Sequence, residues 1–336
     1  MTPPAQRAVI FAYHNVGARC LRVLLAHGID VSLVVTHADD PLEVQWFERV
    51  ADVAADAGLM CSAPVDVNAP AETARIALLG PDFIFSFYYR GMLGPALLAI
   101  PRRGALNMHG SQLPRYRGRA PVNWAVLNGE RQTGATLHYM VDKPDAGDIV
   151  AQQAVPILPD DTSHEVSHKV TVAAEICLDA VLPALIAGTA KRWPNDIARG
   201  SYFGRRTPAD GRIDWSKSAR EIHNLVRAVA PPYPGAFTEV GGEPARVLRT
   251  RLLDADAPSS TPALTVAKTS RVAQQTATVE GTASMTDSPA TAEEDVLVAR
   301  CGGGGTLRID RLEIAGKPCS ATAFRARFGD GPVHPA

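Results

Sequence analysis

The stretch GALNMHGSQLPRYRGR, residues 104–119, contains the strand and the polar side chains on which the predicted fold and function depend. It opens with a short apolar alternation, which predicts a β-strand over 105–109, and it ends in turn-forming residues and arginines. Residues two apart on a strand share a face, so Asn107 and His109 should point the same way. This pair suits acyl transfer, because the Asn107 amide can stabilise an oxyanion and the His109 imidazole can transfer a proton. The alternative is that Asn107 begins a turn and His109 is a hydrogen-bonded core histidine.

Strands and helices alternate on both sides of this stretch. Apolar runs at 8–12, 31–36 and 82–89 predict parallel strands, with crossover helices at 19–27, 41–57 and 71–79. Later strands are expected at 135–141 and 149–157, followed by a helix from 162 to about 188. The predicted fold class is α/β, with a Rossmann-like, open, mostly parallel sheet. The first turn, 13–17, lacks G-x-G-x-x-G, which disfavours a dinucleotide cofactor.

The character of the sequence changes near residue 205, where arginine and glycine become frequent. We therefore expect a catalytic, ligand-binding domain over 1–204 and a second domain over 205–330. A helix at 221–230, short strands and a hairpin around Gly302–Gly305 predict a small OB-like β-barrel for the second domain. Residues 254–295 are mostly Ala, Ser, Thr and Pro, so we expect a disordered insert there.

Composition narrows the function classes. The 34 Lys and Arg against 35 Asp and Glu give a net charge of −1, which argues against binding of nucleic acid. The five cysteines are scattered and none forms C-x-x-C, a pattern of reduced thiols without a metal site. The N-terminus does not resemble a signal peptide, and no apolar stretch approaches the ~20 residues needed to insert into a membrane. We expect a cytoplasmic protein; its oligomeric state stays open.

Asp145 is the third candidate for the site. It lies in the loop after the strand expected at 135–141. If that strand lies beside the strand of Asn107 and His109, the carboxylate can reach the imidazole, fix its tautomer and raise its pKa. The alternative is that Asp145 is only a turn residue of the D-A-G-D loop.

Three motifs together resemble the 10-formyltetrahydrofolate-dependent formyltransferase family. They are the Asn-x-His strand end, H-G-S-x-L-P-x-Y-R-G-x-x-P at 109–121 and D-x-G-D-I at 145–149, within a similarity over about 8–253 and 296–328. The resemblance implies 10-formyltetrahydrofolate as co-substrate and no metal. It implies that His109 transfers protons, Asn107 binds the oxyanion and Asp145 supports His109. The implied folate-binding residues are Gly91, Met92, Leu93, Arg119, Val141, Asp142, Lys143, Pro144 and Asp145.

The acceptor is indicated by further segments, at 9–14, 85–90, 118–124, 203–208 and 223–230. They resemble the family members that formylate UDP-4-amino-4-deoxy-L-arabinose in lipid A biosynthesis and polymyxin resistance, which implies a UDP-linked amino sugar. Arg205 and Arg206 could bind its diphosphate bidentately, with Tyr233 nearby, although a solvated surface pair is the alternative. Methionyl-tRNA, another nucleotide-linked amino sugar, and water in a formyltetrahydrofolate hydrolase are the alternative acceptors.

Overall fold

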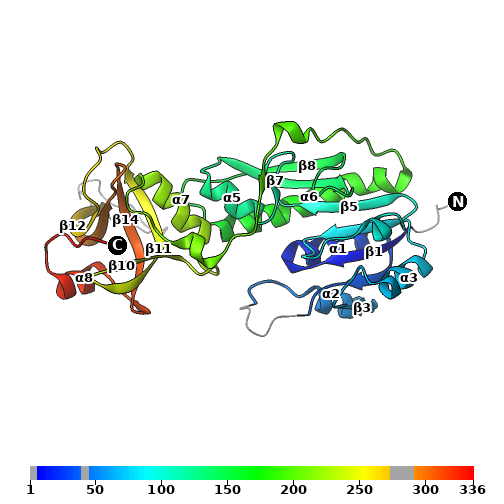
Figure 1. Ribbon diagram of the computed structural model, residues 1–336, viewed down its shortest axis with the longest axis horizontal. Helices are drawn as coiled ribbons and strands as arrows, with labels where there is room; N and C mark the ends of the chain where they lie inside the picture. Colours follow the sequence, from blue (N-terminus) through cyan, green and yellow to red (C-terminus); the bar gives the residue numbers. More distant parts are fainter. Residues whose placement is uncertain (1–5, 39–44, 273–290) are drawn as a thin grey trace, which may run out of the picture. The chain divides into compact units, whose positions relative to one another are not determined.

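The computed structural model describes residues 6–38, 45–272 and 291–336. The chain divides into two compact units, Met1–Arg206 and Thr207–Ala336 (Figure 1). The boundary expected between 204 and 205 lies two residues earlier than this division. Each unit has its own sheet and its own hydrophobic core.

The first unit is built on a seven-stranded sheet in the order β3-β2-β1-β4-β5-β7-β8. Neighbouring strands from β3 to β5 run parallel, and β7 and β8 are antiparallel additions at one edge. This confirms the expected Rossmann-like, mostly parallel sheet. The strands are β1 (Arg7–Ala12), β2 (Asp30–Val35), β3 (Cys61–Ser62), β4 (Phe83–Phe87), β5 (Gly104–His109), β7 (Gln132–Tyr139) and β8 (Ile149–Pro156).

Helices cover both faces of this sheet. Ile76 and Leu97 pack with Val9 and Phe11 in one hydrophobic cluster. Helices α1 and α6 pack against each other, α1 also contacts β1 and β4, and α6 contacts β7 and β8. The helix expected over 41–57 is shorter, because Trp46 and Phe47 make ring contacts with His14 before the helix begins. The helices are α1 (His14–Ala26), α2 (Val50–Asp56), α3 (Pro70–Leu78), α4 (Pro95–Leu98), α5 (Pro121–Leu127) and α6 (Ser163–Ala187).

The long helix α6 is apolar enough to cross a membrane by length and composition, contrary to the expectation from sequence. The helix packs against β7, β8 and α1, and its side chains Val166, Val170 and Leu178 are among those that are buried. That is the position of a core helix, and core helices pass the same test of length and composition.

A two-stranded parallel ribbon adds a feature that the sequence did not predict. β6 (Arg117–Gly118) pairs with β9 (Tyr202–Phe203), so residues far apart in the chain lie side by side. Only glycine fits at 118, because its φ is +96° and a Cβ there would lie 2.2 Å from the carbonyl oxygen of Phe203. The ribbon thus attaches residues 202–203 directly to the stretch that contains the candidate site.

The second unit is an antiparallel sheet in the order β10-β11-β14-β13-β12, with β15 paired to β14. Val333 bridges to β12 and Pro335 bridges to β10, so the last residues link the two outer strands in a barrel-like arrangement. Helix α7 packs its apolar face against this sheet. The elements are α7 (Ala219–Val229), β10 (Ala236–Val240), β11 (Glu243–Asp254), β12 (Ala263–Val272), β13 (Thr291–Arg300), β14 (Thr306–Ile314), β15 (Lys317–Pro318) and α8 (Ala321–Phe328).

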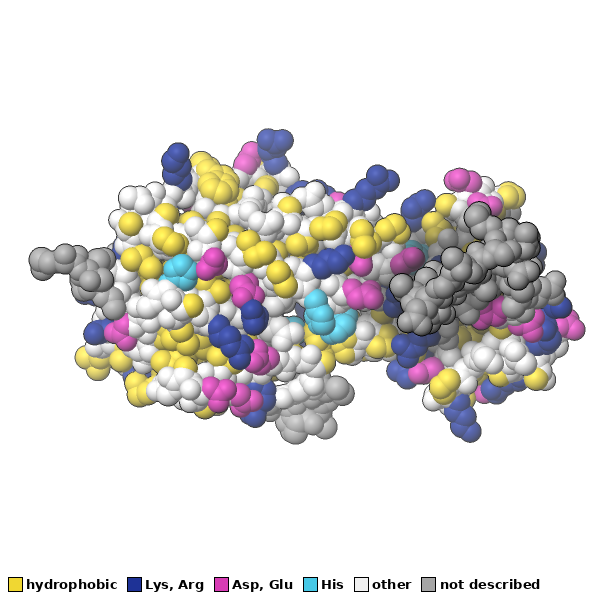
Figure 2. All heavy atoms as spheres, turned by 180° about the vertical axis from the view of Figure 1, so that it is seen from behind, with side chains coloured by type: hydrophobic (Ala, Val, Ile, Leu, Met, Phe, Trp, Pro, Cys, Tyr) yellow, Lys and Arg dark blue, Asp and Glu magenta, His cyan; other side chains and the backbone are white. Residues whose placement is uncertain are grey.

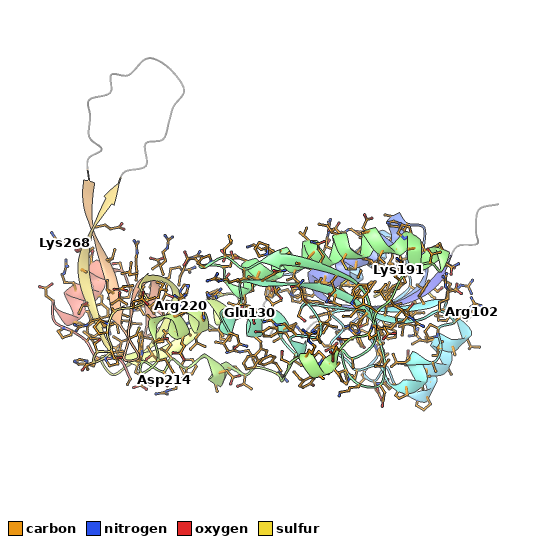
Figure 3. The ribbon with its side chains drawn as sticks, turned by 90° about the horizontal axis from the view of Figure 1, so that it is seen from above. Arg102, Glu130, Lys191, Asp214, Arg220 and Lys268 are labelled. Atoms are coloured by element: carbon orange, nitrogen blue, oxygen red, sulfur yellow. The ribbon has the colours of Figure 1, made fainter. Side chains whose placement is uncertain are left out.

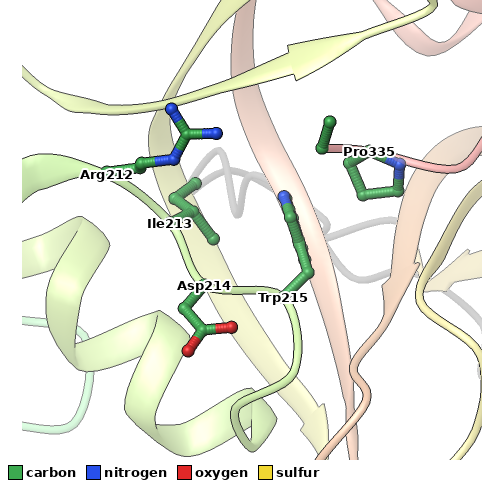
Figure 4. A pocket seen from close by; sticks show the side chains of 6 residues that line it. Arg212, Ile213, Asp214, Trp215 and Pro335 are labelled. Atoms are coloured by element: carbon green, nitrogen blue, oxygen red, sulfur yellow. The ribbon is translucent and has the colours of Figure 1, made fainter.

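An open pocket of the second unit lies next to these last residues (Figure 4). Buried Trp215 lines it, and the indole Nε1 donates a hydrogen bond to Thr238 Oγ1 at 2.8 Å. The Thr238 hydroxyl in turn donates to the carbonyl oxygen of Ala336 at 2.5 Å. The pocket therefore reflects how the final residues are held against the sheet, and it contains none of the residues that the sequence nominated.

The expectation of a disordered insert over 254–295 is wrong for much of that segment. Residues 263–272 form β12 and residues 291–295 begin β13, and the two strands pair along their whole length (Figure 3, near Lys268). The prediction of disorder rested on the low content of large apolar residues, but Ala263 and Leu264 of β12 are fully buried. Asp254 ends β11, residues 255–262 belong to no helix or strand, and residues 273–290 lie outside the described part of the chain.

This correction yields a stability prediction. Leu264→Ala should lower the free energy of unfolding of the second unit by about 2–5 kcal/mol, because it leaves a cavity in a closed core. Leu253→Ala is the control, since that side chain is 52% exposed on β11 and should change stability little. Urea unfolding with amide exchange in β13 and β14 measures both. Equal effects of the two variants would contradict the core position of β12.

Candidate active site

Asn107 and His109 lie on β5, near the middle of the sheet. β5 pairs with parallel β4 on one side and antiparallel β7 on the other. The two side chains follow Ala105 on the same face, where Ala105 packs into the hydrophobic cluster of the first unit. Asn107 is half-buried and His109 is 6% exposed. The strand and the shared face are therefore as expected, and Asn107 does not begin a turn.

The imidazole of His109 is held between two acceptors. Its Nε2 donates to the carbonyl oxygen of Tyr116 at 2.8 Å, since a carbonyl can only accept. Its Nδ1 faces Asp145 Oδ1 at 3.6 Å. A neutral ring in this orientation keeps its lone pair on Nδ1, and a proton taken up there comes to lie beside the carboxylate. The ring is thus placed to accept a proton and to be stabilised as an imidazolium.

Asp145 reaches the imidazole because β7 lies beside β5, as expected. Its Oδ2 accepts from the backbone N–H of Gly118 at 2.9 Å, and its Oδ1 lies 3.6 Å from both His109 Nδ1 and His138 Nε2. The residue has a φ of +49°, a conformation that aspartate and asparagine tolerate better than most residues. Asn195 Nδ2 donates to its carbonyl oxygen at 3.0 Å and holds the loop in place.

Asp145 is an anion at neutral pH. Burial by itself would raise the pKa of this carboxyl, but His109, His138 and the Gly118 N–H together outweigh burial and hold the pKa well below its ordinary value. The site therefore contains one fixed negative charge, which is bound by the Gly118 N–H and lies beside the imidazoles of His109 and His138.

The depressed pKa of Asp145 predicts how stability depends on pH. Ionisation of this carboxyl is more favourable in the folded chain, so it stabilises the fold above the ordinary pKa of about 3.9 and this stabilisation is lost as the pH falls through the lower folded pKa. The stability advantage of the wild type over Asp145→Asn should therefore shrink below about pH 4. Urea unfolding from pH 7 to 3 tests this, with Asp148→Asn as the control. An advantage that grows on acidification would contradict the assignment.

His138 is a site residue that the sequence analysis missed. It lies opposite Asn107 on β7, is 1% exposed, and its Nδ1 donates to the carbonyl oxygen of Tyr139 at 2.8 Å. Its Nε2 is then an acceptor and receives a hydrogen bond from Asn107 Nδ2 at 3.1 Å. His138 thereby orients the amide of Asn107. The signal was available in the alternation of ATLHYMV, residues 135–141, once that strand is paired with 105–109.

The segments nominated for folate lie around one hydrophobic cluster. Leu93 is buried in it, and Met140, just before Val141, packs against it. Asn68, which the sequence analysis also missed, fixes the first segment: its Nδ2 donates to Met92 O at 2.8 Å and its Oδ1 accepts from Gly94 N at 2.7 Å. Asp142 and Lys143 are exposed, Pro144 is intermediate, and Gly91 lies in the turn after β4.

The nominated arginines have different surroundings. Arg119 and Arg205 are exposed, and neither side chain has a hydrogen-bond or ion-pair partner within the described ranges. Arg206 lies over the ring of Trp124, 5.0 Å from its centroid, in the first unit. Tyr233 belongs to the second unit, in the turn after α7. Arg119 thus directly follows β6, and Arg205 lies two residues after β9.

Across the described residues, no group of three or more His, Cys, Asp or Glu side chains could hold a metal ion.

Comparison with known proteins connects this geometry with a family. Two family models match, described as formyl transferase over residues 9–182 and formyl transferase C-terminal domain over residues 205–329. Among solved structures, WlaRD, a sugar 3N-formyl transferase crystallised with dTDP and 5-N-formyl-THF, is 17% identical with a TM-score of 0.65. That alignment covers 93% of this chain and 98% of WlaRD.

Two further solved structures share the fold. An N-formyltransferase from Helicobacter canadensis, in complex with folinic acid and dTDP-3-aminofucose, is 16% identical with a TM-score of 0.63 and covers 91% of this chain and 98% of its own. A 4-N formyltransferase from Francisella tularensis is 20% identical with a TM-score of 0.55, over 69% and 91% of the two chains. Because the N-terminal family model alone spans more than half of the sequence and contains Asn107, His109 and Asp145, the chain belongs to the formyl transferase family.

Proposed function

We propose that this protein transfers the formyl group of 10-formyltetrahydrofolate to the 4-amine of UDP-4-amino-4-deoxy-L-arabinose. The observation that carries the proposal is the arrangement of Asn107, His109 and Asp145 around the end of β5. It combines an oriented amide donor, an imidazole and a fixed carboxylate, which are the groups that transfer of a formyl group to an amine requires.

In this proposal the amine nitrogen of the sugar attacks the formyl carbon. Asn107 donates through its amide to the formyl oxygen as that oxygen becomes an oxyanion. His109 takes the proton that the amine loses and delivers a proton to N10 as the C–N10 bond breaks. The anionic carboxylate of Asp145 stabilises the imidazolium between these two transfers.

The formyl donor is supported by the surfaces around Leu93 and Val141. Met92 and Val141 are 55% and 46% exposed, so two apolar side chains face solvent on the segments nominated for folate. A flat aromatic ligand would cover such side chains. WlaRD and the Helicobacter enzyme were solved with formylated folates, which supports the same donor class for this chain.

The acceptor class is supported by the relatives and by the distribution of charge. The same two relatives were solved with dTDP or a dTDP-linked amino sugar. The face in Figure 2 shows acidic and basic side chains intermixed rather than a continuous basic field. A protein that binds tRNA phosphates would need such a field. UDP-4-amino-4-deoxy-L-arabinose is the acceptor that the sequence favours among nucleotide-linked amino sugars.

The proposal is tested by assaying formyl transfer from 10-formyltetrahydrofolate to UDP-4-amino-4-deoxy-L-arabinose, to dTDP-linked 3- and 4-amino sugars, and to methionyl-tRNA. We expect product with the UDP sugar at the highest kcat/KM. Controls without acceptor measure hydrolysis of the donor. Preferred formylation of methionyl-tRNA, or release of formate at the same rate without acceptor, would overturn the proposal.

Replacing Arg205 and Arg206 together with alanine should raise the KM for the sugar nucleotide ten-fold or more. Charge-assisted contacts to a diphosphate contribute about 1.5–3 kcal/mol each, and Arg205 has no competing partner among the described residues. The KM for 10-formyltetrahydrofolate should change little. Initial-rate kinetics with each substrate varied in turn measure both constants. Equal losses for the two substrates would indicate that the segment only maintains structure.

A further inference from the structure

Arg117 is a buried cation without a partner. Its side chain is 8% exposed, and its Nε and Nη1 are inaccessible to solvent with no hydrogen-bond acceptor in the described part of the chain. No carboxylate of the described residues forms an ion pair with it, and the guanidinium carbon lies over the ring of Tyr202, 5.9 Å from the ring centroid. Tyr202 is itself 59% exposed.

Other arginines of this chain show that such a side chain is normally satisfied. Arg227, 6% exposed, donates from Nε and Nη2 to Asn224 Oδ1 at 3.0 and 2.8 Å. Arg103 donates to the carbonyl oxygens of Leu185 and Ile186. Arg115, two residues before Arg117, pairs with Glu130, which also accepts from Tyr116 Oη at 2.8 Å (Glu130 in Figure 3). Arg117 is an exception to this pattern.

The backbone around Arg117 holds the catalytic groups. The carbonyl oxygen of Tyr116 accepts from His109, and the N–H of Gly118 donates to Asp145. Arg117 N donates to Ser201 O at 3.0 Å, which fixes the residue in the β6–β9 ribbon. An anion bound by Arg117 would therefore lie close to the reacting atoms, on a segment whose position is fixed by several hydrogen bonds.

An arginine cannot lose its proton in a protein, so a buried guanidinium without acceptors destabilises the ligand-free fold. A second cation without a hydrogen-bond or ion-pair partner in the described ranges, Arg205, lies two residues after β9, the strand that pairs with the strand of Arg117. These strands therefore bring positive charge together without a carboxylate of their own, since the carboxylate of Asp145 is bound by the Gly118 N–H and faces His109 and His138. That imbalance is expected of a site completed by an anionic ligand.

We propose that Arg117 is the buried anchor of a diphosphate subsite on the β6–β9 ribbon, with Arg205 at its exposed side. The proposal rests on the function proposed above, because the diphosphate is that of the nucleotide-linked acceptor. A single sugar ring separates the reacting amine from the diphosphate, so an anion site one residue from the contacts of His109 and Asp145 fits this substrate. The planar fork of arginine matches two phosphate oxygens bidentately.

The glutamate carboxylates of the folate are the competing source of anionic charge. They are separated from N10 by the whole aminobenzoyl group, and the apolar folate segments lie around Leu93 and Met140 rather than on this ribbon. We therefore assign Arg117 to the nucleotide and not to the folate.

The test measures thermal unfolding of the wild type, Arg117→Met, Arg117→Lys and the control Arg115→Met. Each protein is unfolded without ligand and with UDP, dTDP or inorganic pyrophosphate. Sulfate at equal ionic strength is the control for unspecific stabilisation by anions. Wild type and Arg115→Met should gain Tm with UDP and pyrophosphate beyond the gain with sulfate. Arg117→Met should unfold about 2 °C or more higher than wild type without ligand, because a buried unpaired charge is removed, and it should gain nothing from pyrophosphate. Arg117→Lys should retain part of the gain, because it keeps the charge without the fork.

Kinetics complete the test. The KM for the sugar nucleotide should rise ten-fold or more in Arg117→Met, whereas the KM for 10-formyltetrahydrofolate should stay within about two-fold. An unchanged response of Arg117→Met to UDP and pyrophosphate would overturn the proposal, as would a rise confined to the KM of the folate. Pyrophosphate binding requires no acceptor to be formylated. A diphosphate response that depends on Arg117 would therefore stand even if every amino sugar failed as a substrate.

Discussion

Asn107→Ala is expected to lower kcat about 10²–10³-fold while the KM values of both substrates change by only a few-fold. The amide acts on charge that develops at the formyl oxygen, so its removal affects the transition state much more than the bound substrates. His109→Ala should lower kcat by two decades or more for the same reason, because the proton moves only during reaction. Single-turnover and steady-state kinetics with 10-formyltetrahydrofolate and the sugar nucleotide measure these losses.

Asn68→Ala is the matched control for this prediction. It removes an asparagine whose side chain bridges Met92 O and Gly94 N on a segment nominated for folate. Its loss should therefore appear mainly as a higher KM for the formyl donor, with kcat reduced far less than in Asn107→Ala. If Asn107→Ala kept a near-wild-type kcat, or changed only KM as Asn68→Ala does, the oxyanion role of Asn107 would be wrong.

Strands and helices that are marked by a pattern in their own residues could be predicted from the sequence. The apolar runs that became β1, β2 and β4 are buried on both faces, and such runs are read directly as central strands. The capping box of Thr162 and Glu165 begins α6 where the sequence places it, and Gly188 ends the helix with a φ of +74°. The shared face of Asn107 and His109 followed from their i, i+2 spacing once the strand was assigned correctly.

Long-range pairing was the part that the sequence could not supply. His138 becomes relevant only when the register sets it opposite Asn107, and no local pattern contains that register. The β6–β9 ribbon joins two strands of two residues each, too short for any periodicity to reveal. The same limit explains β12, which is defined by its pairing with β13 and whose Leu264 is buried in the core of the second unit, although the composition of 254–295 is poor in large apolar residues.

Asp145→Asn is the second substitution with a large expected effect. We expect kcat to fall about 10²–10⁴-fold, because the amide removes the fixed charge that stabilises the His109 imidazolium. In serine hydrolase triads the corresponding carboxylate-to-amide change lowers kcat about 10⁴-fold. The separation of 3.6 Å between Asp145 Oδ1 and His109 Nδ1 is longer than a hydrogen bond, which favours the lower end of this range.

Asparagine is the substitution of choice at this position for a backbone reason. The φ of +49° at Asp145 suits asparagine and would strain alanine, so Asp145→Ala mixes loss of charge with distortion of the loop. Asp148→Asn, in the same D-A-G-D segment, removes a charge whose side chain is 47% exposed and lies 3.9 Å from Arg192; it should leave kcat within about two-fold. A kcat of Asp145→Asn equal to that of Asp148→Asn would show that Asp145 serves the loop and not the reaction.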